Sequence, residues 1–134
     1  MLKLIAGKKG SGKTKQLISM VNSAVEVSNG KVVCIEKGTK LTYDINHSAR
    51  LLDTESFHIA GYEAFYGFLA GIAASDYDVK EIFVDSIFKI AGENFDEVSK
   101  LIAKIDALFD SDVSVTLTIS ADPSELPDGV KKYI

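Results

Sequence analysis

The spacing of three glycines near the start of the chain restricts its fold more than any other feature does. They lie in the segment Gly7-Lys8-Lys9-Gly10-Ser11-Gly12-Lys13-Thr14, which fills every position of the pattern G-x-x-x-x-G-K-[ST]. The apolar run Leu2–Ala6 before it predicts a short strand, and apolar residues recur at helical spacing from Lys13 to about Ser28. The chain is therefore expected to begin with a strand, a glycine loop and a helix, as parallel α/β proteins do.

The residue types of this loop are suited to holding a chain of phosphates. Glycines let the backbone turn so that its N–H groups point inward, and the positive end of the helix dipole lies at the same place. In a triphosphate complex Lys13 would reach the β- and γ-phosphates, and the Thr14 hydroxyl would ligate Mg²⁺. The alternative is a glycine turn with a cluster of solvated lysines. We expect the nucleotide-binding residues to be the eight that fill the pattern, namely Gly7, Lys8, Lys9, Gly10, Ser11, Gly12, Lys13 and Thr14.

Length and composition exclude several classes of protein. The 134 residues are expected to form one domain, residues 1–134, with a core of its own. No apolar run approaches the ~18 residues of a membrane span, so a membrane partner is not expected. The first apolar stretch ends at Ala6 and leads into the loop, which argues against a signal peptide and for a cytoplasmic location. A net charge of −4 without an aromatic-interleaved basic stretch argues against a nucleic-acid partner.

Strands and helices are expected to alternate along the rest of the chain. Their periodicity predicts strands at Lys31–Lys37, Glu81–Asp85 and Val113–Ile119, and helices at Ala60–Ala74 and after the cap Asn94. Cys34 is expected to be buried in a strand, without a redox or metal role. The polar stretch Gly38–Ser56 predicts a loop with an extended piece at Ala49–Leu52, and Gly129–Ile134 a last short strand. This order predicts a three-layer α/β fold with a small, mainly parallel sheet flanked by helices, which binds ligands at the carboxyl ends of its strands.

A carboxylate stands at the end of the strand Glu81–Asp85. Beside a bound triphosphate, Asp85 would hold the hydration shell of Mg²⁺, so Thr14 and Asp85 are the predicted metal residues. The alternative is a strand-end aspartate that only caps the turn that follows.

The segments Gly7–Thr14 and Ile82–Asp85 resemble the first and second motifs of the P-loop NTPase superfamily. The resemblance implies a parallel sheet that binds ATP with Mg²⁺, and it extends as a pattern over most of the chain. Many ATPases of this superfamily place a catalytic glutamate directly after the aspartate, where this chain has Ser86. The usual candidate for the base is therefore missing from its position.

The recombinase and thymidine-kinase-like branch of that superfamily offers another base. In that branch a glutamate at the end of the strand after the first helix can orient the attacking water, and Glu36 occupies this place. The resemblance thus implies catalytic roles for Lys13, Glu36 and Asp85. A solvated Glu36 that pairs with Lys37 or Lys40 remains an equal alternative.

The strand Val113–Ile119 gives two conflicting indications. Ser120 at its end matches the polar residue that such ATPases often carry on the strand beside the loop strand, which the resemblance makes central in the sheet. The alternation of apolar and polar residues predicts instead a half-exposed strand. Either Thr116 and Thr118 are covered by a helix or the strand order differs.

Other branches fit the sequence less well. Lys8 is similar to the signature lysine of partition and site-selection ATPases, which crosses a dimer interface, but Lys9 stands where they have glycine. Monophosphate kinases use several arginines, whereas Arg50 is the only one here; the Gly38–Ser56 region around it is where we would look for a second ligand or a partner. No N-K-x-D segment indicates a GTPase, so ATP is favoured over GTP. Three aromatic residues of the Ala60–Ala74 helix could stack on a base, although helical spacing favours the core: Tyr62, Phe65 and Tyr66.

The chain as a whole resembles small bacterial proteins that are labelled ATP-binding or are likened to twitching-motility ATPases, but it lacks the length of a secretion motor. We expect a protein that binds MgATP and hydrolyses it slowly or with the help of a protein partner or a second copy of itself. One alternative is a nucleotide-dependent switch or adaptor without significant hydrolysis. Another is a small-molecule kinase, against which the shortage of arginine counts.

Overall fold

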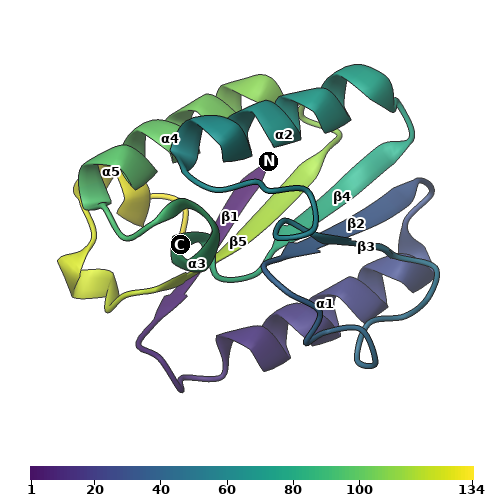
Figure 1. Ribbon diagram of the computed structural model, residues 1–134, viewed down its shortest axis with the longest axis horizontal. Helices are drawn as coiled ribbons and strands as arrows, with labels where there is room; N and C mark the ends of the chain where they lie inside the picture. The colour runs from purple at the N-terminus through teal and green to yellow at the C-terminus, as the bar shows by residue number, and fades with distance from the viewer.

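The computed structural model describes all residues, 1–134, and arranges them in three layers (Figure 1). Five strands form one sheet: β1 Leu2–Gly7, β2 Lys31–Glu36, β3 Arg50–Asp53, β4 Val79–Val84 and β5 Ser114–Ser120. The helices are α1 Lys13–Val27, α2 Tyr62–Ser75, α3 Ile87–Ala91, α4 Phe95–Leu108 and α5 Asp128–Lys131, with a single 3-10 turn at Pro123–Glu125. All strand pairs are parallel, in the order β1-β5-β4-β2-β3. The prediction of a three-layer α/β fold with a parallel sheet is confirmed.

The two faces of the sheet carry separate apolar cores. One core joins the sheet to α1 through residues such as Leu17 and Val21, together with Leu41 and Ile45 of the connection after β2. The larger core joins the opposite face to the remaining helices, with Phe65 of α2 fully buried in it. Figure 1 shows α1 on one side of the sheet and α2 and α4 on the other. No helix is both long and apolar enough to span a membrane.

Strand β5 is central, and the prediction that it is half-exposed is wrong. It lies between β1 and β4, and both of its threonines are buried, with 5% of Thr116 and none of Thr118 exposed. The alternation reflects two different buried faces. Leu117 belongs to the larger core, whereas Thr116 shares a cavity with residues of α1 and Thr118 bonds to Asp85, which contacts Thr14 of α1. The Thr118 hydroxyl is tolerated there because it is hydrogen-bonded on both sides, to Asp85 and to Ser86.

The end of the chain also differs from expectation. The segment predicted as a last strand, Gly129–Ile134, instead contains most of α5 and a turn. Pro127 precedes that helix, a position that proline favours, and Val130 is fully buried in the larger core. A single backbone hydrogen bond, from Leu4 N to the oxygen of Tyr133, ties the tail to the free edge of β1. The extended piece expected at Ala49–Leu52 is present as β3.

Candidate functional site

The glycine loop connects the end of β1 to the start of α1, as its sequence predicts. Gly10 and Gly12 have φ angles of 86° and 87°, values that residues with a Cβ rarely adopt. Gly7 differs from them, because its φ is not left-handed but a Cβ there would overlap with the Ser11 hydroxyl, which would have to move. The glycine spacing thus follows from the shape of the loop, whose Ser11 N–H donates back to the Lys8 oxygen over 3.1 Å.

Lys13 lies across this loop and only 8% of it is exposed. Its Nζ donates to the Lys8 carbonyl oxygen at 3.0 Å and to Ser11 Oγ at 3.4 Å. Burial lowers the pKa of Lys13 from its usual 10.5, nearby Asp85 opposes this shift, and the charge of Lys89 adds to it. The loop therefore encloses a positive charge that no carboxylate neutralises by direct contact.

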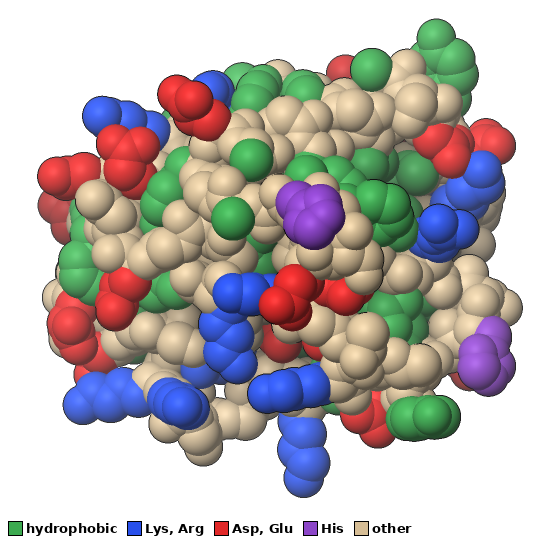
Figure 2. All heavy atoms as spheres, viewed as in Figure 1, with side chains coloured by type: hydrophobic (Ala, Val, Ile, Leu, Met, Phe, Trp, Pro, Cys, Tyr) green, Lys and Arg blue, Asp and Glu red, His purple; other side chains and the backbone are tan.

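A cavity of about 460 Å³, here called the loop cavity, opens beside the loop. Its ten lining residues include four lysines and no acidic residue: Lys9, Gly10, Gly12, Lys13, Thr14, Lys15, Ser86, Phe88, Lys89 and Ser120. The four ion pairs of the chain all involve other lysines. Figure 2 shows Lys and Arg side chains gathered in the lower part of the view, around the loop and the start of α1. This cavity is chemically suited to a polyanion.

Asp85 lies at the end of β4 and touches the first turn of α1. Thr14 Oγ1 is 3.2 Å from Asp85 Oδ1 and 3.3 Å from Oδ2, and Thr118 Oγ1 donates to Oδ1 at 3.0 Å. Only 9% of Asp85 is exposed. The strand order accounts for the bond between Thr118 and Asp85, since β5 lies beside β4 in the sheet. A hydroxyl and a carboxylate are thus held together at the mouth of the loop, 71 positions apart in sequence.

The residue after Asp85 has an unusual backbone. Ser86 has a φ of 60°, in the left-handed region, and its N–H donates to Thr118 Oγ1 at 2.7 Å. Its hydroxyl lies 3.4 Å from Asp85 Oδ2. This turn ends β4 and starts α3 directly above the loop cavity.

Thr14 and Asp85 fit Mg²⁺ only as part of a larger ligand set. The chain has no group of three or more His, Cys, Asp and Glu side chains that could hold a metal ion by themselves. Mg²⁺ usually takes one or two protein oxygens and completes its octahedron with water and substrate phosphates. The observed pair of oxygen donors matches that requirement when a phosphate chain is present.

Glu36 ends β2 next to Asp85, because Ile35 of β2 pairs with Val84 of β4. Only 4% of Glu36 is exposed, and its Oε2 accepts a 3.0 Å hydrogen bond from the Leu41 N–H. Burial raises the pKa of Glu36; the N–H donors of the following turn oppose this shift, and Asp85 adds to it. The alternative of a solvated Glu36 in an ion pair with Lys37 or Lys40 is wrong, since no such pair forms.

A second cavity of about 280 Å³, here called the Glu36 cavity, lies on the other side of Thr14. Its lining is Thr14, Glu36, Lys37, Lys40, Leu41, Asp85, Ser86 and Lys89. It shares Thr14, Ser86 and Lys89 with the loop cavity, so these three residues lie where the two cavities adjoin. A carboxylate with a raised pKa therefore faces a space beside the loop.

Of the other residues singled out in the sequence, only Ser120 lines the loop cavity. Ser120 pairs with Gly7 across the sheet and lines the loop cavity, as expected for a polar residue beside the loop. Lys8 lies 3.8 Å from Asp122 of its own chain. Arg50 begins the edge strand β3, at the end of the sheet opposite to the loop. Phe65 is a core residue, and Cys34 is fully buried in β2, where desolvation raises the pKa of its thiol to about 12.

Tyr62 and Tyr66 are also structural, and neither lines the loop cavity. The Tyr62 hydroxyl donates to the Gly92 carbonyl oxygen, and Tyr66 lies under Lys104, whose Nζ is 4.2 Å from the ring centroid. A base stacked on these rings would lie outside the loop cavity.

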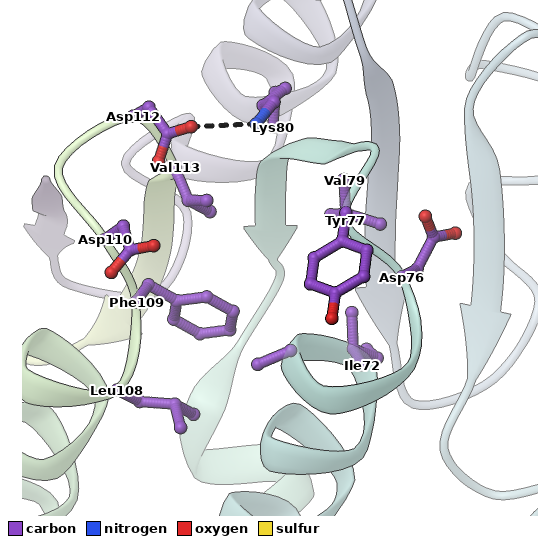
Figure 3. A pocket seen from close by; sticks show the side chains of 11 residues that line it. Ile72, Asp76, Tyr77, Val79, Lys80, Leu108, Phe109, Asp110, Asp112 and Val113 are labelled. Atoms are coloured by element: carbon purple, nitrogen blue, oxygen red, sulfur yellow. Dashed lines mark hydrogen bonds and ion pairs between the residues drawn. The ribbon is translucent and has the colours of Figure 1, made fainter.

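A further cavity, of about 240 Å³, lies at the opposite end of the sheet, between the connections that precede β4 and β5 (Figure 3). Seven of its eleven lining residues are hydrophobic, and the rings of Tyr77 and Phe109 come from the two connections. Its one lysine, Lys80, is neutralised by Asp112 at 2.8 Å. With no free cation, this cavity does not offer the chemistry that a phosphate needs.

Sequence reasoning missed Lys89, Phe88 and Thr118. The short helix α3 carries the first two and has only five residues, so no periodicity indicates it. Thr118 reaches Asp85 only because β5 is inserted beside β4. Comparison of the chain with protein-family models and with curated protein sequences found no match. Its function is therefore inferred from the two adjoining cavities.

Proposed function

We propose that this protein binds MgATP in the loop cavity. The observation that carries the proposal is a cavity beside a left-handed glycine loop, lined by four lysines that join no ion pair and by no carboxylate. Such an excess of unpaired positive charge is unfavourable by itself and is relieved by a polyanion. A triphosphate chain fits the direction in which the loop leads into α1, where N–H groups and the helix dipole favour negative charge.

The proposed roles follow from position. Backbone N–H groups of Gly7–Thr14 would hold the β-phosphate, and the Lys13 amine would exchange its contact with Ser11 for phosphate oxygens. Thr14 and Asp85 would hold Mg²⁺, Thr14 directly and Asp85 through water. When bound, Mg²⁺ supplies neutralisation of charge on the β- and γ-phosphates.

Hydrolysis would use Glu36 as the group that orients water. The water oxygen forms a bond to the γ-phosphorus while the bond from that phosphorus to the β,γ-bridging oxygen breaks. The bridging oxygen leaves with its electron pair as part of ADP, and the proton of the water passes to Glu36. A carboxylate of raised pKa is a better proton acceptor than a solvated one, which suits this role.

One observation favours the alternative of a switch without significant hydrolysis. The Oε2 atom of Glu36 already accepts the Leu41 N–H, which anchors the turn after β2. Glu36 would then hold the turn after β2 in place, and that turn would change its conformation when a γ-phosphate binds near Thr14. An ATPase that is slow, or that needs a partner, lies between the active ATPase and the switch.

Calorimetry with Mg²⁺ and a non-hydrolysable ATP analogue tests the binding proposal. We expect Lys13→Ala to bind at least about tenfold more weakly than the parent, because a charge-assisted contact to phosphate is lost. Lys131→Ala is the matched control, since Lys131 is an exposed lysine that lines neither cavity and joins no ion pair. If Lys13→Ala kept the parent affinity while remaining folded by circular dichroism, the proposal would be wrong.

A single-turnover experiment with γ-labelled ATP separates the candidate activities. Label released as inorganic phosphate supports the ATPase, and a slower release by Glu36→Gln with unchanged binding supports the role of Glu36. Binding with no release over hours favours the switch. Label found on an added metabolite instead of in phosphate indicates the small-molecule kinase.

A further inference from the structure

Lys89 lies where the loop cavity and the Glu36 cavity adjoin, and it is a lysine of α3 that lines both. It comes four positions after Asp85, at the helix that starts directly beyond Ser86. In the sequence nothing distinguishes it from the other lysines.

The packing of α3 determines which side of the helix carries Lys89, whose side chain is exposed. Ile87, Ile90 and Ala91 are buried in the larger core, so the helix cannot rotate without exposing them. With these three residues buried, Phe88 and Lys89 lie on the side of α3 that lines the loop cavity. The Gly92 N–H donates to the Phe88 oxygen at 3.0 Å and closes the helix at this point.

The amine of Lys89 has no anionic partner in its own chain. Glu36 and Asp85 line the same Glu36 cavity, yet neither carboxylate comes within ion-pair distance of Lys89. Its charge acts instead on Lys13, whose pKa it helps to lower. Lys13 of α1 and Lys89 of α3 thus both line the loop cavity, and no carboxylate lines it with them.

We propose that Lys89 contacts the terminal phosphate of the bound triphosphate and is the residue that makes the site distinguish ATP from ADP. The inference rests on the proposed function. Lys13 and Thr14 would hold the β- and γ-phosphates, and a chain that extends past Thr14 would bring the γ-phosphate to the residues shared with the Glu36 cavity, which include Lys89. A diphosphate ends before it reaches them.

The same position gives Lys89 a role during phosphoryl transfer. Negative charge on the γ-phosphoryl oxygens persists while the bond to the bridging oxygen breaks, and a nearby cation stabilises that arrangement. In a chain with a single arginine, remote from the loop, Lys89 would supply this charge from within the same molecule. An additional subunit or partner would then not be needed for that contact.

The test compares ADP with a non-hydrolysable ATP analogue, both with Mg²⁺, by calorimetry. We expect Lys89→Ala to lose about tenfold or more in affinity for the ATP analogue and less than about twofold for ADP. Lys89→Arg should restore the preference, because it restores the charge. Lys131→Ala removes the same charge from another short helix and should leave both affinities unchanged.

Single-turnover rates at saturating ATP provide a second measurement. Lys89→Ala should release phosphate more slowly than the parent even when fully bound, and Lys89→Arg should recover most of the rate. Equal losses for ADP and the ATP analogue, or no loss for either, would overturn the assignment of Lys89 while leaving nucleotide binding intact. If the parent bound neither nucleotide, the proposed function itself would be wrong, and this inference with it.

Discussion

Thr118 Oγ1 donates a 3.0 Å hydrogen bond to Asp85 Oδ1 and accepts a 2.7 Å bond from the N–H of Ser86. One buried hydroxyl therefore holds both the carboxylate of the candidate metal site and the turn that starts α3. The bond crosses from β5 to the end of β4, so it depends on the central place of β5 in the sheet.

Replacing Thr118 by Val should destabilise the protein by about 1–3 kcal/mol, because it leaves the Ser86 N–H without a partner in a partly buried turn. Thr116→Val is the matched control on the same strand and face: Thr116 is buried but makes no comparable bond to the site, so a change of about 0.5 kcal/mol or less is expected. Urea unfolding of the three proteins measures both values. Equal effects at the two positions would show that the hydroxyl of Thr118 is not structurally important.

Glu36 should make stability depend on pH in a recognisable direction. Its pKa is raised above the usual 4.5, so the native state binds a proton that the unfolded state has already released. The free energy of unfolding should then fall as pH rises from about 4.5 through the raised pKa, and remain level above it. Glu36→Gln cannot titrate, and its amide oxygen can still accept the Leu41 N–H. The difference in unfolding free energy between Gln and parent should therefore grow in favour of Gln over this range.

Chemical unfolding at about pH 4.5, 6 and 7.5 measures this difference. Glu125→Gln serves as a control, since Glu125 is exposed and lines neither cavity. A difference that is constant with pH, or that grows in favour of the parent, contradicts the raised pKa of Glu36.

The left-handed backbone at Ser86 predicts that glycine is better tolerated there than alanine. Both substitutions remove the long 3.4 Å contact to Asp85 Oδ2, so they differ mainly in the φ of 60° that the turn requires. Ser86→Gly should be about 1 kcal/mol more stable than Ser86→Ala, because alanine pays the steric cost of the left-handed region. Thermal unfolding of the pair is sufficient, and a more stable Ala variant would show that the turn relaxes.

The fold was predictable from the sequence where the signal is local. The glycine spacing of Gly7–Thr14 predicted a turn between a strand and a helix, and Gly10 and Gly12 do have positive φ angles there. The apolar run at β4 predicted a strand that leads to Asp85. The face of β5 was not predictable, since a threonine looks exposed until its partners are known. The predicted final strand failed because the burial of Val130 depends on contacts outside its own segment.

The candidate site was predictable for the same reason in its loop and at the end of β4. Lys13, Thr14 and Asp85 belong to contiguous patterns with their own backbone requirements. Lys89 lies in a helix of five residues, and its relevance depends on the rotation of that helix against the core. Glu36 was expected at the end of the strand after the first helix and does end β2, whereas its bond to Leu41 depends on a turn that has no sequence signal.

Two glycines with different backbone conformations, Gly67 in α2 and Gly92 after α3, give a last prediction, about stability alone. Gly67 is exposed in the interior of this helix, and a Cβ built there meets no atom within 4 Å. Gly67→Ala should raise the free energy of unfolding by about 0.5–1 kcal/mol, because alanine loses less backbone entropy in a helix. Gly92→Ala is the contrasting variant: its φ of 108° strains any side chain, so it should destabilise although space is available. If both variants were stabilised in urea unfolding, backbone strain at Gly92 would be excluded as the reason for that glycine.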